Sequence, residues 1–318
     1  MIGIDLGGTN MQFGVVTPDG RVLSRAKRKT LADEGEEAIL MRLLSGVEEA
    51  CKAAGTPMAE IRAVGIGAPG AVDPHRGLVL EAPNLRWRDM PLGMRLEDRL
   101  GRPVAVDNDV NVAIWGELQH GAGRGAREML GVWVGTGVGG GLVLDGKLHL
   151  GHFFTAGEIG HMTVAPGNPP GLRTLENLCS RTAIVNRLTH MIEANADSIV
   201  PELVEGKLNK IKSRTLAEAY NRQDPTVRLL VDDAARRIGV VAGSLATLLS
   251  LERVVMGGGL TEAIGEPFVA AVRESVHEVV FPSALRSVIV VGSELEDNAG
   301  VIGAALLARD RLGSVQPA

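Results

Sequence analysis

The spacing of apolar residues near the start of the chain predicts strands followed by a long helix. Residues 2–6 and 13–16 are apolar runs on either side of a glycine-rich turn, and the Asp-Gly pair at 19–20 is typical of hairpins. We therefore expect residues 2–30 to form a strand meander. Over residues 36–53 the apolar positions recur at helical spacing, with Glu and Lys between them, which predicts an amphipathic helix.

The remaining pattern alternates between short apolar strands and helical segments. Residues 198–212 are charged and irregular, which predicts a surface helix and loop. The expected strands are residues 63–66, 104–106, 254–256 and 288–291, and the expected helices are residues 92–100, 109–119, 226–250, 267–279 and 299–311. Strands that alternate with helices argue for an α/β fold. We expect the residues after 312 to be frayed.

A second glycine-rich stretch repeats the pattern of the first. Residues 131–146 contain an apolar strand, a Gly/Thr turn, another apolar strand and an Asp-Gly hairpin, in the same order as the start of the chain. Agreement at each of these successive features favours duplication over a chance likeness between two glycine-rich hairpins. Two related halves, each with a Gly/Thr turn, would form a cleft with a phosphate-binding loop on both sides.

Composition and charge argue against a nucleic-acid-binding protein, a disulfide-rich protein and a membrane protein. The 318 residues are 45% hydrophobic, which is enough for two domains with separate cores. The net charge is −5 and no basic run is present, so we expect no nucleic-acid partner. Cys51 and Cys179 are too few for a disulfide framework or for a metal cluster of their own. We expect a cytoplasmic protein without a signal peptide and without a membrane partner, because no apolar run reaches membrane-spanning length.

The segment at residues 3–10 is the first candidate for binding chemistry. Glycines at a tight turn let backbone N–H groups approach an anion, and Thr9 and Asn10 add side-chain donors. Asp5 lies near the end of a predicted buried strand, where a carboxylate needs a partner such as a hydrated cation. From these residues alone, an anion-binding loop and an ordinary glycine-rich hairpin remain equally open.

Further motifs follow along the chain in a fixed order. They are Pro83-Asn84-Leu85 with Trp87, Asn108-Asp109-Val110-Asn111, Gly135-Thr136-Gly137-Val138-Gly139, Ala156-Gly157-Glu158-Ile159-Gly160-His161, Leu175-Glu176 and Gly257-Gly258-Gly259. Together with the opening segment, this order resembles the ROK family of sugar kinases, and within it the bacterial glucokinases. The resemblance covers nearly the whole chain. It implies a two-domain α/β fold of the actin-like ATPase (ribonuclease H-like) type, with a central interdomain cleft.

The resemblance also implies the division of the chain. A small α/β domain would span residues 1–109, and the C-terminal helix at about 299–318 would pack back on it. A large α/β domain would span residues 110–298. Members of the family suggest a homodimer.

The resemblance further implies a site for ATP and a hexose. Asp109 would be the catalytic base that takes the proton of the attacking hydroxyl, whereas position alone favours a helix cap for an Asp at a helix start. The sugar would be bound by Asn84, Asn108, Asp109, Glu158, His161 and Glu176. ATP would be bound by Asp5, Gly7, Gly8, Thr9, Asn10, Gly135, Thr136, Gly137, Gly139, Gly258 and Gly259. Asp5 would reach Mg²⁺ through water, and the ion would help to spread the charge of the transferring phosphoryl group.

One segment departs from the family pattern. Many members follow the motif histidine with a cysteine-rich loop that binds zinc together with it, but residues 166–176 contain no cysteine and Cys179 comes later. Three thiolates cannot be assembled, so we expect no zinc site of that kind. We expect the prolines to hold this loop and His161 to be free for the sugar.

The expected activity is transfer of the γ-phosphoryl group of ATP to the 6-hydroxyl of a hexose, with glucose as the first choice. Fructose, mannose, N-acetylmannosamine and N-acetylglucosamine remain open as acceptors, and polyphosphate as donor. A non-catalytic sugar sensor is disfavoured because both Asp5 and Asp109 are present. Transcription regulators of the same family carry a helix-turn-helix segment before the first phosphate loop, which begins here at residue 3, so we expect no such segment.

Overall fold

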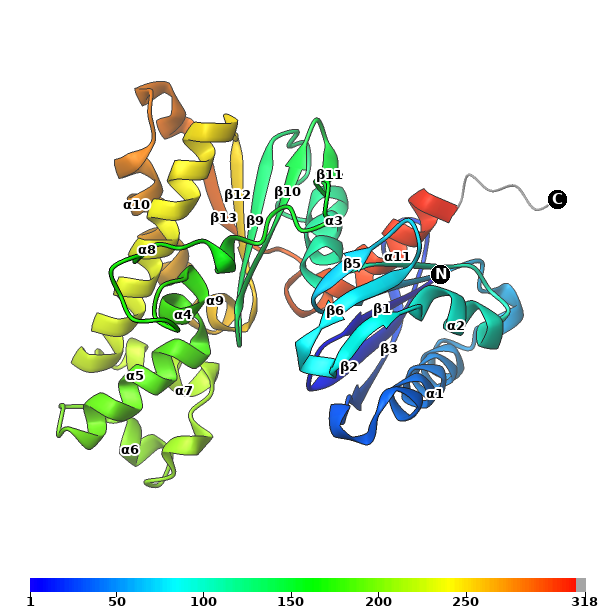
Figure 1. Cartoon of the computed structure of the whole chain (residues 1–318), viewed down its shortest axis with the longest axis horizontal. Helices are drawn as coiled ribbons and strands as arrows, with labels where there is room; N and C mark the ends of the chain where they lie inside the picture. Colours follow the sequence, from blue (N-terminus) through cyan, green and yellow to red (C-terminus); the bar gives the residue numbers. More distant parts are fainter. Residues whose placement is uncertain (313–318) are drawn as a thin grey trace. The chain divides into compact units, whose positions relative to one another are not determined.

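The computed structural model describes residues 1–312, which form two compact units (Figure 1). Unit 1 contains Met1–Arg124, Leu150–Ala156 and residues 297–312, and unit 2 contains Gly125–His149 and Gly157–Glu296. Each unit buries its own apolar core. The fraying predicted after residue 312 lies outside the described residues. No helix in residues 1–312 combines the length and the apolar composition that crossing a membrane requires.

Unit 1 is built on a five-stranded sheet in the order β3-β2-β1-β4-β8. The strands are β1 (Ile2–Leu6), β2 (Asn10–Val16), β3 (Val22–Lys29), β4 (Val64–Ala68) and β8 (Val104–Asn108). The first three pair antiparallel, as the meander prediction requires, whereas β4 lies parallel to both β1 and β8. The carboxyl ends of three parallel strands therefore meet at one edge of this sheet.

Helices cover both faces of this sheet. They are α1 (Glu36–Ala54), α2 (Leu92–Leu100), α3 (Asp109–His120) and α11 (Ala299–Leu312). Phe13 of β2 contacts α1 at Gly46, while the next residue, Gly14, faces Val301 of α11, so α1 and α11 lie on opposite faces. A Cβ at Gly65 of β4 would lie 1.8 Å from the Ala304 carbonyl oxygen. Only glycine permits so close an approach of α11 to the sheet.

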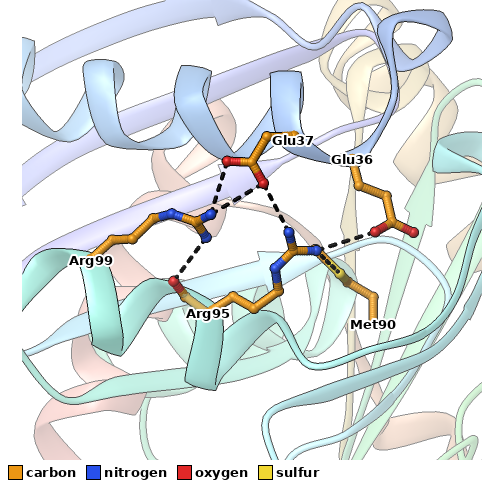
Figure 2. A network of polar contacts seen from close by, with 5 residues as sticks. All are labelled: Glu36, Glu37, Met90, Arg95 and Arg99. Atoms are coloured by element: carbon orange, nitrogen blue, oxygen red, sulfur yellow. Dashed lines mark hydrogen bonds and ion pairs between the residues drawn. The ribbon is translucent and has the colours of Figure 1, made fainter.

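Charged side chains join α2 to α1 on the surface of unit 1 (Figure 2). Arg95 donates to Glu36 at 3.2 Å and to Glu37 at 2.9 Å, and Arg99 donates to both oxygens of Glu37. The same Arg95 contacts the sulfur of Met90, which links the network to β7 (Trp87–Met90). Because the groups are solvent-exposed, each ion pair contributes only about 0.2–1 kcal/mol, and the network chiefly orients α2.

A small antiparallel sheet, β5-β6-β7, completes unit 1. It consists of β5 (Ala71–Asp73), β6 (Leu78–Ala82) and β7, and it was not predicted from the sequence. A single helical turn at Pro83–Leu85 connects β6 to β7 and carries Asn84.

Unit 2 repeats the sheet of unit 1. Its order is β11-β10-β9-β12-β13, and the strands are β9 (Met129–Val134), β10 (Val138–Leu144), β11 (Lys147–His149), β12 (Arg253–Gly257) and β13 (Ile289–Gly292). The first three again pair antiparallel, and β12 again lies parallel to both β9 and β13. The shared topology supports the duplication predicted from the two glycine-rich stretches, and it confirms the predicted α/β class.

The helices of unit 2 include two that were predicted individually, one that lies within the surface helix and loop predicted for residues 198–212 (α6), and others that were not predicted. The predicted pair, α8 (Pro225–Leu249) and α10 (Glu266–Val279), pack against each other. The others are α4 (Leu175–Cys179), α5 (Arg181–Glu193), α6 (Val200–Leu203), α7 (Ser213–Asn221) and α9 (Gly259–Ile264).

The units divide the chain differently from the predicted boundary at residue 109. Helix α3 packs against α11 and β4, and residues 109–124 therefore belong to unit 1. The loop at residues 150–156 also belongs to unit 1, where Phe154 contacts the ring of His75 edge-on at 5.6 Å. Helix α11 packs on β1 and β4 of the sheet of unit 1.

Candidate active site

The carboxyl edge of the sheet in unit 1 gathers several of the predicted residues. Asp5 of β1 lies opposite Gly67 of β4, which in turn lies opposite Asp107 of β8. Residues in one such row project to the same face of a sheet. Asn108 and Asp109 follow directly where β8 passes into α3. The topology therefore places Asp5 and the Asn-Asp motif at the same edge of unit 1.

The first phosphate loop is a tight turn held by a threonine that sequence reasoning missed. The N–H of Gly7 donates to the carbonyl of Asn10 at 3.0 Å. The buried Thr30 donates through its hydroxyl to the Gly7 carbonyl at 2.6 Å and through its N–H to the Thr9 carbonyl. A Cβ at Gly8 would lie 3.2 Å from the Cβ of Asn84. The structure thus brings Asn84 against this loop, within unit 1.

Asp5 lies in an environment that disfavours its charge. Burial is the main cause that raises its pKa to about 6, and the nearby Asp297 carboxylate adds to this, whereas Lys27 opposes it. The side chain packs against the start of α11, where a Cβ at Gly300 would lie 2.9 Å from Asp5 Cγ. Two carboxylates that repel each other suit a divalent cation, because a bound cation would relieve the repulsion.

Asn108, and not Asp109, is the N-cap of α3. The Asn108 side-chain oxygen accepts the N–H of Val110 at 2.9 Å and that of Asn111 at 3.1 Å, and its amide nitrogen donates to the Gly70 carbonyl at 3.0 Å. One amide hydrogen of Asn108 is left for a ligand. Asp109 is the first helical residue, where the helix dipole stabilises a negative charge. Asn108 therefore caps the helix start, and Asp109 Oδ1 accepts the Val110 N–H as well, at 2.9 Å.

Asp107, the residue before the Asn108-Asp109 motif, is a buried carboxylate that was not among the predicted site residues. Asp107 is 1% exposed and forms an ion pair with Arg311 of α11 at 2.5 Å. Its other oxygen accepts the side-chain amide of Asn111 at 3.0 Å and the N–H of Asn108 at 2.7 Å. Asp107 therefore fixes the backbone from which Asn108 and Asp109 extend.

The second phosphate loop, residues 135–139, is held from two directions. The N–H of Gly135 donates to the Gly137 carbonyl at 2.9 Å, which closes the turn. Glu176 of α4 accepts the N–H of Val138 at 2.9 Å. From the start of α5, Arg181 donates through its guanidinium to the Thr136 hydroxyl at 2.8 Å. Arg181 was not among the predicted residues, since a lone Arg at a helix start has no motif of its own.

The predicted sugar-binding residues of unit 2 lie together beside this loop. Burial raises the pKa of Glu158, the nearby Glu176 raises it further, and His161 lowers it. Gly160 packs against β10, where a Cβ would lie 1.9 Å from the Val138 carbonyl oxygen and 3.5 Å from the Cβ of Glu176. Glu158, His161 and Glu176 thus form one electrostatic group.

The third glycine motif abuts the second phosphate loop. It follows β12, and Gly258 has a φ of +89°, a conformation that favours glycine. A Cβ at Gly258 would lie 2.7 Å from the N–H of Val134, the residue before Gly135. The turn at Gly258 and Gly259, which was predicted to bind ATP, and the second loop are therefore adjacent in unit 2.

The proline-containing loop at residues 166–171 is tied by hydrogen bonds. Asn168 donates to the Leu172 carbonyl at 2.9 Å, Arg173 donates back to the Asn168 carbonyl at 2.5 Å, and Thr163 pairs with Thr174 as an isolated bridge. These hydrogen bonds tie the two ends of the loop together. Over residues 1–312, no three His, Cys, Asp or Glu side chains lie grouped so as to hold a metal ion.

Comparison with known proteins shows the relatives of this chain. The model of the ROK family matches residues 1–311. The glucokinase of Thermotoga maritima is 33% identical over 98% of both chains, and that of Streptomyces coelicolor is 35% identical over 97% of both. The crystal structure of a ROK family glucokinase from Streptomyces griseus, in complex with glucose and AMPPNP, is 34% identical and has a TM-score of 0.86, covering 98% of this chain and 99% of that one.

Proposed function

The chain belongs to the ROK family, and we propose that it is an ATP-dependent hexose kinase whose preferred acceptor is glucose. The observation that carries this proposal is the start of α3. Asn108 caps the helix, and the adjacent Asp109 carboxylate lies at the positive end of the helix dipole, at the same sheet edge as the loop that follows β1. A carboxylate not required as a cap is suited to accept a proton.

On the acceptor side, Asp109 takes the proton of the attacking 6-hydroxyl as the oxygen approaches phosphorus. The remaining amide hydrogen of Asn108, the amide of Asn84 and the group of Glu158, His161 and Glu176 hydrogen-bond the other hydroxyls. Burial raises the pKa of Glu158 because its carboxylate has lost part of its contact with water. A sugar hydroxyl that donates to this carboxylate would replace the lost hydrogen bonds and so stabilise it.

On the donor side, the two glycine-rich loops bind the phosphates of ATP through backbone N–H groups, with Thr9 and Thr136 as added hydroxyl donors. The Gly258-Gly259 turn approaches the adenosine. Asp5 holds Mg²⁺ through water, and Asp297 adds negative charge nearby. When bound, this ion neutralises part of the charge on the transferring phosphoryl group.

The test is a coupled assay of ADP release with a panel of acceptors. Glucose, mannose, fructose, N-acetylmannosamine and N-acetylglucosamine are compared at saturating ATP and Mg²⁺, and ATP is compared with polyphosphate. The highest kcat/KM is expected for glucose with ATP. A higher value for another hexose would correct the acceptor and keep the kinase. Sugar binding without turnover for any pair would favour a sensor.

We also propose a cytoplasmic homodimer. Large apolar side chains are exposed on unit 2, among them Leu248 of α8 at 76% and Phe281 after α10 at 74%. The Phe281 N–H donates to the hydroxyl of Thr247, which places the backbone of Phe281 beside the last turn of α8, where Leu248 also lies. Light scattering is expected to give twice the mass of the chain, and Phe281→Ser combined with Leu248→Ser is expected to give a monomer. A monomeric parent protein would overturn this assignment.

A further inference from the structure

The first residues of α5 form several hydrogen bonds with the second phosphate loop. The Arg181 N–H donates to the Gly135 carbonyl at 2.9 Å, and the Thr182 hydroxyl donates to the Thr136 carbonyl at 2.7 Å. The Arg181 guanidinium then reaches the Thr136 hydroxyl at 2.8 Å. A backbone anchor and a side-chain contact on the same residue fix the place of the guanidinium at the exposed side of the loop.

The charge of Arg181 is not compensated by the protein. In residues 1–312 it forms no ion pair, whereas Arg187 on the same helix pairs with Asp233 at 3.0 Å. The carboxylate of Glu176, which contacts the same loop, accepts from the Val138 N–H instead. Neither strand of the hairpin, residues 129–144, contains a Lys or Arg. Arg181 therefore brings a positive charge to this loop from the start of α5.

The chemistry of the guanidinium indicates the ligand. It has five N–H donors in a planar fork, and the Thr136 hydroxyl takes one of them. The others are matched in geometry and charge to phosphate oxygens. The hydroxyl contact orients the fork without neutralising it, because a hydroxyl carries no charge.

We propose that Arg181 binds the β- and γ-phosphates of the donor nucleotide seated in the second phosphate loop. The assignment rests on the proposed kinase function, since it requires a nucleoside polyphosphate donor. It adds a positive side chain to a site whose other protein donors on this loop are neutral N–H groups and one hydroxyl. Affinity for the donor then depends on the number of phosphates it carries.

Calorimetric titration of the full-length protein with ADP, a non-hydrolysable ATP analogue and adenosine tests this assignment. Arg181→Gln is expected to weaken binding of ADP and the analogue about tenfold, the loss of one charge-assisted hydrogen bond, and to change adenosine binding less than about twofold. Arg181→Lys is expected to recover part of the loss. In kinetic assays the KM for ATP rises and the KM for the hexose stays constant.

The salt dependence separates a phosphate contact from mere support of the loop. Arg181→Gln is expected to flatten the decline of ADP affinity with ionic strength, because one opposite-charge contact has gone. The matched control is Arg222→Gln. It removes the Arg that directly follows α7 and pairs with Glu218. Equal loss for adenosine and ADP, or an unchanged salt dependence, would overturn the role of Arg181 alone. A parent protein that binds none of the three ligands would overturn the kinase proposal itself.

Discussion

Replacement of Asp109 by Asn is the sharpest perturbation of the proposed chemistry. The new side chain keeps an oxygen that can accept the Val110 N–H, at 2.9 Å in the parent, but it cannot take a proton. The Asn108 cap is untouched, and the cost to folding includes the lost charge–dipole interaction, about 0.3–1 kcal/mol. A general base contributes about 10²–10⁴ in rate, equivalent to about 3–5 kcal/mol of transition-state stabilisation.

We therefore expect kcat to fall by about 10²–10⁴, with a change in melting temperature of no more than about 4 °C. Coupled ADP release gives kcat, calorimetry gives glucose affinity, and thermal unfolding checks the fold. Asp98→Asn, on the exposed face of α2, is the matched control and should leave all three unchanged. If the Asp109 variant keeps more than a tenth of the parent kcat, Asp109 is not the base.

Three further outcomes concern the fold around the site. Arg311→Ala leaves the buried Asp107 carboxylate without its ion pair and is expected to lower the free energy of unfolding in urea by about 2–3 kcal/mol; a loss below about 0.5 kcal/mol would contradict the importance of the pair. Gly65→Ala forces a Cβ against α11 and is expected to cost more than about 3 kcal/mol, whereas Gly167→Ala, which meets no atom within 4 Å, should be near neutral by the same measurement. Because the pKa of Asp5 is raised to about 6, the native state holds a proton that the unfolded state releases between about pH 4 and 6, so this group lowers stability as pH rises through that window. Without Mg²⁺, Asp5→Asn should make urea stability less dependent on pH there, and an unchanged slope would refute the assignment.

The long elements were predictable because their apolar positions repeat many times. Helices α1 and α8 show the helical period over several turns, and the paired meanders share an order of glycines and apolar runs. Helices α4 and α7 were missed because five or nine residues contain too few apolar positions to define a period, and α5 was missed although it spans 13 residues. The sheet β5-β6-β7 was missed for the same reason, since its strands are three to five residues long.

The motifs of the candidate site could be predicted from the sequence, but the individual roles and contacts of their residues could not. Sequence could not separate the cap from the base at the start of α3, because Asn and Asp are nearly equal as N-caps and stand side by side at Asn108 and Asp109. The contact of Glu176 with the second loop could not be foreseen, since its partner is the N–H of Val138, and backbone groups carry no sequence signal. Thr30 and Arg181 escaped notice because each acts through hydrogen bonds to a loop that is distant in the sequence, and neither belongs to a recognisable motif.

The packing of α11 on the sheet of unit 1 has a consequence for the order in which the two units fold during synthesis. Its residues, 299–312, close one face of a sheet whose first strand is β1, and all of unit 2 is translated in between. Until α11 has left the ribosome, the apolar face around Gly3 and Gly65 has no cover, whereas the sheet and helices of unit 2 are already complete. Unit 2 therefore reaches its native packing first, and the N-terminal half of the protein waits for the last helix. Nascent chains that stop before residue 299 should depend on chaperones that shield this face.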